Sequence, residues 1–249
     1  MNEVFHLADA SLLQLTLVCS VAFAVSILSG LAGYGAGLVL PAFLAPLVGI
    51  ANVIPVMAVA MLFNNGSRVA AFWREIQWAH ARYVLTLGLP ACIAGAYGYT
   101  LLSSRWIAIL LGIFLLASVP LRRVMHRMNF HLSHSGVRNA GAVFGFVNGG
   151  MAGTGIILVS ILMSAGIHGT ALIATDAIVS VTMAISKIAL FSGLSKLTAD
   201  LAATGLLIGL STAPGAFIAR RLLNHIPMRV HAWVMEAMVI IGAIALMFF

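Results

Sequence analysis

The stretch Ser29 to Gly37, SGLAGYGAG, constrains the fold more than any other part of this sequence. It holds four glycines within eight positions, inside a longer segment, Ala10 to Ser67, that carries no charged side chain. Each glycine weakens a helix by about 1 kcal/mol relative to alanine, so we expect the chain to leave helical geometry here. The alternative is that these glycines only let helices pack closely, as small residues do in membranes.

Composition indicates a membrane protein. Hydrophobic residues make up 62% of the 249 residues and charged residues 8%, against about 25% charged in soluble domains. Uncharged apolar runs recur, each near the ~20 residues that a helix needs to cross a bilayer. We therefore predict an all-α polytopic protein whose surroundings are the lipid bilayer. The net charge of +7 lies mainly in loops, so we interpret it as a topology signal and not as a nucleic-acid-binding patch.

The glycine pattern returns 120 residues further on, in GGMAGTGII at 149–157. The same offset relates scattered identities as far as Gly95 and Gly215. This predicts two membrane repeats, 1–121 and 138–249, joined by a basic cytoplasmic loop, 122–137. Each repeat has about four to five helical elements. The second element of each, 36–48 and 155–166, is shorter than the ~17 residues of a spanning helix, which favours a half-helix in a re-entrant hairpin.

Loop charges orient the repeats. The connection 121–138 carries four arginines and no acid, which places it in the cytoplasm by the positive-inside rule. With the acidic N-terminus outside, each repeat must cross the membrane an odd number of times. The two repeats are then inverted copies, and both chain termini are external.

Inverted repeats with broken helices are typical of secondary transporters. The free N–H groups and positive helix N-termini beyond each break suit an anionic substrate. Polar side chains beside the breaks, namely Tyr34, Asn148 and Thr154, could add hydrogen-bond donors. We predict that they act with the break glycines Gly33, Gly35, Gly153 and Gly155.

Four ionisable residues fall inside predicted spans, where each costs at least ~2.5 kcal/mol on insertion scales. Arg68 and Asp176 are at similar depth, so an ion pair between them could act as a cytoplasmic gate or a proton-linked switch. Lys187 lies near the outer end of its helix, and Glu236 is the other buried acid available to carry a proton. The alternative for Arg68 and Lys187 is that they extend to the membrane interface without touching substrate.

The predicted site therefore has a cationic and polar character and no catalytic residue. No cofactor is predicted, and no metal site either, because His126, His131 and His134 are joined by no cysteine or acid. Polar neighbours of the two cations complete the predicted substrate-binding set: Asn64, Asn65 and Ser67 near Arg68, and Ser186 near Lys187.

Two motifs resemble the signatures of the TauE/SafE sulfite exporter family. They are GLAGYGAGLVLPAFL at 30–44 and GFVNGGMAGTGIILVSIL at 145–162. The resemblance implies a bacterial cytoplasmic-membrane protein that moves sulfite, a sulfonate or a related small sulfur-containing anion. The sequence departs from the family pattern at Ala36, and the second break lacks the proline that follows the first. Both departures leave the substrate open.

The leading hypothesis is a secondary exporter of a small sulfur-containing anion that works by alternating access, without a nucleotide-binding loop. Its partners are the anion and the bilayer, and a homodimer is left open. A drug/metabolite-type carrier for another organic anion is the nearest alternative, and a channel is a further one. An intramembrane hydrolase would need Ser29, Ser160 or Ser164 as nucleophile and His168 as base, without a G-x-S-x-G motif.

Overall fold

The computed structural model describes residues 11–32, 35–127 and 132–222. Every regular element in this part of the chain is helical. Short 3₁₀ turns at Ile50–Asn52 and Trp73–Glu75 flank the third helix. The α-helices are α1 (Leu12–Ala32), α2 (Ala36–Val48), α3 (Val53–Phe72), α4 (Trp78–Thr100), α5 (Ser104–Arg127), α6 (His134–Gly150), α7 (Gly155–Ser164), α8 (Gly169–Gly193) and α9 (Ala199–Leu222).

Both glycine-rich stretches interrupt a helix, as predicted. The first break separates α1 from α2 and the second separates α6 from α7. Gly35 has φ 131° and Gly153 has φ 82°, conformations that residues with a Cβ seldom adopt. The helices beyond the breaks have 13 and 10 residues. At 1.5 Å per residue they are about 20 Å and 15 Å long, less than the ~30 Å hydrocarbon layer.

Three helices among the described residues are long and apolar enough to cross a membrane. They are α3 with its flanking turns (Ile50–Glu75), α8 and α9. Large apolar side chains such as Leu210 and Phe217 on α9 remain exposed on the outside of the bundle. In a bilayer these side chains would face lipid, where exposed apolar surface carries no penalty.

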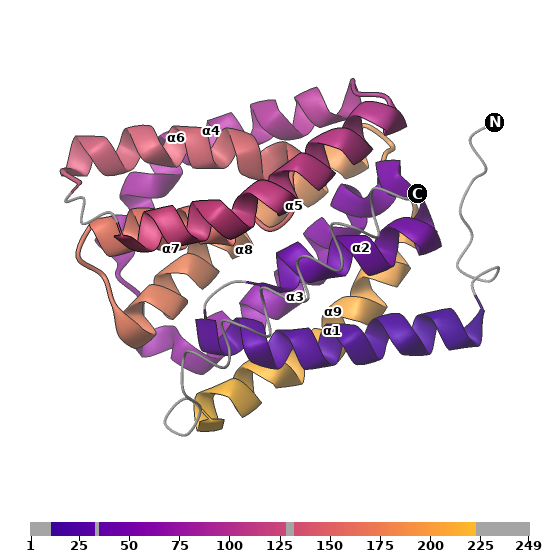
Figure 1. The fold of residues 1–249 in the computed structure, drawn as a ribbon, viewed down its shortest axis with the longest axis horizontal. Coiled ribbons are helices and arrows are strands. Elements are labelled where there is room, and N and C mark those ends of the chain that lie inside the picture. Colours follow the sequence, from indigo (N-terminus) through magenta and orange to yellow (C-terminus); the bar gives the residue numbers. More distant parts are fainter. Residues whose placement is uncertain (1–10, 33–34, 128–131, 223–249) are drawn as a thin grey trace.

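Helices of the first half pack mainly on helices of the second half. α1 packs on α9, α4 on α6, and α3 on both α8 and α9, while α4 also contacts α8. Figure 1 shows α4 and α6 along one edge of the molecule and α1 and α9 along the opposite edge. At the offset of 120 residues, α1 corresponds to α6, α3 to α8 and α4 to α9. When every helix is replaced by its counterpart, the same helix pairs are obtained. The packing therefore follows the repeat seen in the sequence, while the inverted orientation of the halves stays a prediction.

Small residues bring the α4 and α6 backbones into direct contact. A Cβ added at any of five glycines on these helices would collide with backbone atoms of the partner helix. Such close approach is how helices associate in membranes, where van der Waals contact replaces the hydrophobic effect. Glycines therefore serve for close packing on these two helices and for the break at Gly35 and Gly153. The five packing glycines are Gly88 and Gly95 on α4 and Gly141, Gly145 and Gly149 on α6.

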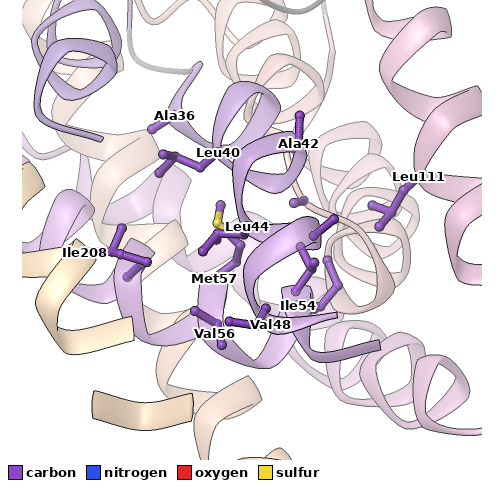
Figure 2. Packing of buried hydrophobic residues seen from close by; sticks show 14 of the residues in the cluster. Ala36, Leu40, Ala42, Leu44, Val48, Ile54, Val56, Met57, Leu111 and Ile208 are labelled. Atoms are coloured by element: carbon purple, nitrogen blue, oxygen red, sulfur yellow. The ribbon is translucent and has the colours of Figure 1, made fainter. Parts of the chain in front are cut away.

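The short helix α2 is buried on most sides. Its residues Leu40 and Leu44 lie in a cluster with Met57 of α3 and Ile208 of α9, which Figure 2 shows. Leu111 of α5 belongs to the same cluster. Gly35, which precedes α2, is buried as well, and burial in protein is the condition under which non-helical backbone is tolerated at membrane depth.

Candidate functional site

A small polar cavity of about 70 Å³ lies where the two helix breaks meet α3 and α8. Space of this size suits a few water molecules or a small polyatomic ion. The breaks contribute Gly35, Gly37, Asn148, Met151, Ala152, Gly153, Thr154 and Gly155, and α1 contributes Ser29. Two helices supply the remaining lining residues: Ile54, Met57, Met61, Asn64, Asn65 and Arg68 from α3, and Asp176, Ser180, Ala184 and Lys187 from α8.

The two breaks touch each other at this cavity. A Cβ placed on Gly37 would lie 2.8 Å from the backbone nitrogen of Gly153 and 3.1 Å from its Cα. The first turns of α2 and α7 both start here, and neither is capped by a side-chain hydrogen bond. The first N–H groups of a helix have no partner within the helix and carry its positive dipole end. Two such ends next to one cavity favour a bound anion.

Arg68 forms the predicted ion pair with Asp176. Its Nη2 lies 2.7 Å from Oδ2 of Asp176, and the two side chains are 2% and 1% exposed. The guanidinium also donates to the Ile173 carbonyl oxygen at 3.2 Å and to Asn65 Oδ1 at 2.8 Å. Arg68 is thus held inside the bundle by α8, and the alternative of an extension to the membrane interface is wrong for this residue.

Lys187 contacts the second break instead of a carboxylate. Its Nζ donates to the carbonyl oxygen of Asn148 at 3.2 Å, and Asn148 Nδ2 donates to Thr154 Oγ1 at 2.6 Å. Within the described part of the chain Lys187 has no ion-pair partner. Its charge is therefore compensated only by a carbonyl dipole, which leaves this end of the cavity positive.

Most of the predicted binding residues come together at this cavity. Ser67 and Ser186 are not part of its lining, because each hydroxyl donates to a carbonyl of its own helix, that of Asn64 and that of Met183. Gly33, Tyr34 and Glu236 lie outside the described residues. The predicted residues that do line the cavity are Gly35, Asn64, Asn65, Arg68, Asn148, Gly153, Thr154, Gly155, Asp176 and Lys187.

Sequence reasoning missed the apolar part of the lining, including Met57, Met61 and Ala184, as well as Ser180. Helical periodicity could have found them. Counting back from Arg68 in steps of three or four residues reaches Met61 and Met57, and counting on from Asp176 in steps of four reaches Ser180 and Ala184.

In the described part of the chain, no hydrogen bond joins His168 to Ser29, Ser160 or Ser164, the residues of the hydrolase hypothesis. Ser29 lines the cavity, whereas Ser160 donates to the Ile156 carbonyl of its own helix and His168 is exposed at the start of α8. A nucleophile and its base must lie within hydrogen-bond reach of each other. The described residues also contain no group of three His, Cys, Asp or Glu side chains that could hold a metal ion.

A model of the family described as Sulfite exporter TauE/SafE matches residues 18–246, which include both breaks and every lining residue of the cavity. The chain belongs to the TauE/SafE sulfite exporter family. TauE/SafE proteins are membrane transporters of sulfite and related anions and not enzymes, so this chain is a multi-pass membrane transport protein. No curated protein and no solved structure matches the chain.

Proposed function

We propose that this TauE/SafE protein is a secondary transporter that exports a small sulfur-containing anion, sulfite or an organosulfonate, by alternating access. The observation that carries the proposal is the cavity between the two breaks, with two helix N-termini and two cationic side chains on its wall. Among the described residues that line it, Arg68 and Lys187 outnumber the one acid, Asp176. A buried site with excess positive charge and free N–H donors favours an oxyanion.

The proposed mechanism assigns the substrate to the space between the breaks, at the interface of two inverted repeats. Transporters with this architecture alternate by rocking one repeat or bundle against the other around such a site. α3 of the first half packs on α8 of the second half, and both helices line the cavity, so a movement of one half against the other would change the shape of the site. The Arg68–Asp176 pair bridges these two helices and would act as the cytoplasmic gate.

Energy would come from an ion gradient or from the gradient of the anion itself. Asp176 is the proposed proton carrier, because protonation would cancel its charge and weaken its hold on Arg68. Glu236 is the second candidate and lies outside the described residues. The proposed location is the bacterial inner membrane, with the loop 122–137 in the cytoplasm and both termini in the periplasm.

Sulfite efflux from proteoliposomes tests the proposal. The sequence has two lysines, Lys187 in the cavity and Lys196 on the exposed surface, which provides a matched pair. We expect Lys187→Met to abolish efflux while Lys196→Met retains it, with both proteins monodisperse in detergent. Efflux at the wild-type rate in Lys187→Met would refute the proposed site. If the efflux rate is the same with and without an imposed pH gradient, the hypothesis of proton coupling is refuted and the rest of the proposal is unaffected.

A further inference from the structure

Three residues that line the cavity each have one buried side-chain polar atom without a hydrogen-bond partner among the described residues. These atoms are Arg68 Nε, Asp176 Oδ1 and Asn64 Oδ1. Arg68 Nε is a donor, whereas an ionised carboxylate oxygen and an amide oxygen are acceptors. Buried polar groups in folded proteins are almost always bonded, so an unpartnered set beside a cavity indicates the hydrogen-bond pattern of its ligand.

The donor side of the cavity matches an anion. Lys187 uses one of its three donors for the Asn148 carbonyl, and Arg68 has Nε free after its Nη atoms have bonded Asn65, Ile173 and Asp176. The acceptor side is different, because an anion with only oxygen acceptors would place negative charge against Asp176 Oδ1 and Asn64 Oδ1. A ligand that satisfies both sides must accept hydrogen bonds at one end and donate at another.

The charge of the lining limits the valence of the ligand. The charged side chains among the described lining residues are Arg68, Lys187 and Asp176, which leave one net positive charge. A monoanion balances that charge. A dianion leaves an excess negative charge close to the carboxylate of Asp176, in a buried site where like charges repel strongly.

We infer, resting on the proposed function, that the cavity selects a monoanion that itself carries an N–H or O–H group. Its sulfonyl oxygens accept hydrogen bonds from Arg68 and Lys187. An NH₂ group donates one hydrogen to Asp176 and one to Asn64, whereas a single O–H group donates to one of the two. Asp176 is then a specificity residue as well as the partner of Arg68, because its carboxylate disfavours dianions and anions that lack a donor. Sulfite meets both requirements in its singly protonated form, hydrogensulfite.

Three probe anions separate these requirements. Sulfamate and methanesulfonate are monoanions of almost equal size that differ in an NH₂ group against a CH₃ group, and sulfate is a dianion without a donor. Titration calorimetry on the purified full-length chain is expected to show sulfamate binding at least about tenfold more tightly than methanesulfonate, since the methyl group leaves the buried acceptors unpaired. Sulfate is expected to bind more weakly than methanesulfonate.

Equal affinity for sulfamate and methanesulfonate overturns the donor requirement, and sulfate binding as tight as sulfamate overturns the valence rule. These outcomes use the unmodified protein, so they decide the inference even if no variant folds. Asn64→Leu is expected to shrink the ratio of sulfamate to methanesulfonate affinity several-fold, because it removes one of the two acceptors. Ser211→Ala, on the exposed face of α9, is the control and should leave every affinity unchanged.

The proposed function can fail separately from this inference. If sulfite efflux depends on Lys187 but none of the three probes discriminates as expected, the transporter assignment stands and the selectivity inference is wrong. If sulfamate is preferred but Lys187→Met retains full efflux, the cavity binds such anions and the proposed transport site is wrong.

Discussion

The two halves of the molecule share their packing. Gly95 on α4 faces the Phe146 backbone on α6, and Gly215 on α9 faces Ser26 on α1. Both members of the second pair are related to the first by the offset of 120 residues that relates the two glycine breaks. The close helix contacts at the two edges of the bundle are therefore made by equivalent positions, so the repeat relates individual contact residues as well as whole helices.

The charged groups do not follow the repeat. The positions that correspond to Arg68, Asp176 and Lys187 at the same offset are Ile188, Val56 and Ser67. Each charge at the cavity is thus present in one half only. The difference shows that the two halves share the scaffold and both helix breaks, whereas the charged residues of the cavity make it asymmetric.

The largest expected effect comes from removing one partner of the ion pair. Asp176→Ala leaves the Arg68 guanidinium buried and uncompensated, which should lower the free energy of unfolding by about 3 to 5 kcal/mol. Val56→Ala at the corresponding position removes only apolar contacts and should cost about 1 to 2 kcal/mol. Thermal unfolding of the two variants in the same detergent measures the difference.

A double variant separates the charge from the packing. Arg68→Met with Asp176→Leu replaces the pair by apolar side chains, which in other proteins is neutral or stabilising. We expect it to recover most of the stability that Asp176→Ala loses, while anion transport is lost. If Asp176→Ala and Val56→Ala lowered the free energy of unfolding by the same amount, the Arg68–Asp176 ion pair would have no special effect on stability, and the two corresponding positions would contribute equally.

The scaffold could be predicted from the sequence because its signals are local or periodic. Composition indicates the membrane class, and glycine spacing predicts both breaks, at which Gly35 and Gly153 have positive φ angles. The contact between Gly37 and Gly153 was only implied by the repeat. Which helices lie next to each other depends on packing between distant segments, and no spacing in the sequence specifies that α1 pairs with α9.

Of the candidate site, the sequence predicts mainly the residues that are charged. A charge inside a span is costly, so Arg68, Asp176 and Lys187 could be selected from the sequence. Ser67 and Ser186 were selected because they neighbour those charges, but adjacent positions on a helix point in different directions. The bond from Lys187 to the Asn148 carbonyl was not predictable, because it depends on how the end of α6 lies against α8.

The repeated glycine contacts predict paired effects of intermediate size. Gly95→Ala should cost about 1 to 3 kcal/mol of unfolding free energy, because its Cβ meets the Phe146 backbone, which cannot rotate away. Gly215→Ala should also destabilise, but by less, since its nearest obstacle is the Ser26 hydroxyl and the backbone nitrogen of Ile27 is further away, at 2.8 Å. Gly98 on α4 faces open space, so Gly98→Ala is the control and should be neutral or stabilising. Stability equal to wild type in Gly95→Ala would contradict the close contact between α4 and α6.

The smallest expected effect concerns Tyr99, whose hydroxyl donates to the carbonyl oxygens of Ile50 and Ala51 at 3.2 and 3.0 Å. This bond ties α4 to the turn between α2 and α3. The corresponding position in the second half is Ala219, which has no hydroxyl.

Tyr99→Phe keeps the ring and removes only this bond, so we expect a loss of about 1 kcal/mol. The control Tyr97→Phe, at an exposed position on the same helix, should change nothing measurable in the same unfolding assay. On α9 the neighbouring Arg220 makes a different contact, because its Nη1 donates to the carbonyl oxygen of Ala71 at the end of α3. Arg220→Met should therefore cost more than Tyr99→Phe, because a charged donor makes the stronger hydrogen bond. A larger loss of unfolding free energy in Tyr99→Phe than in Arg220→Met would contradict this expectation.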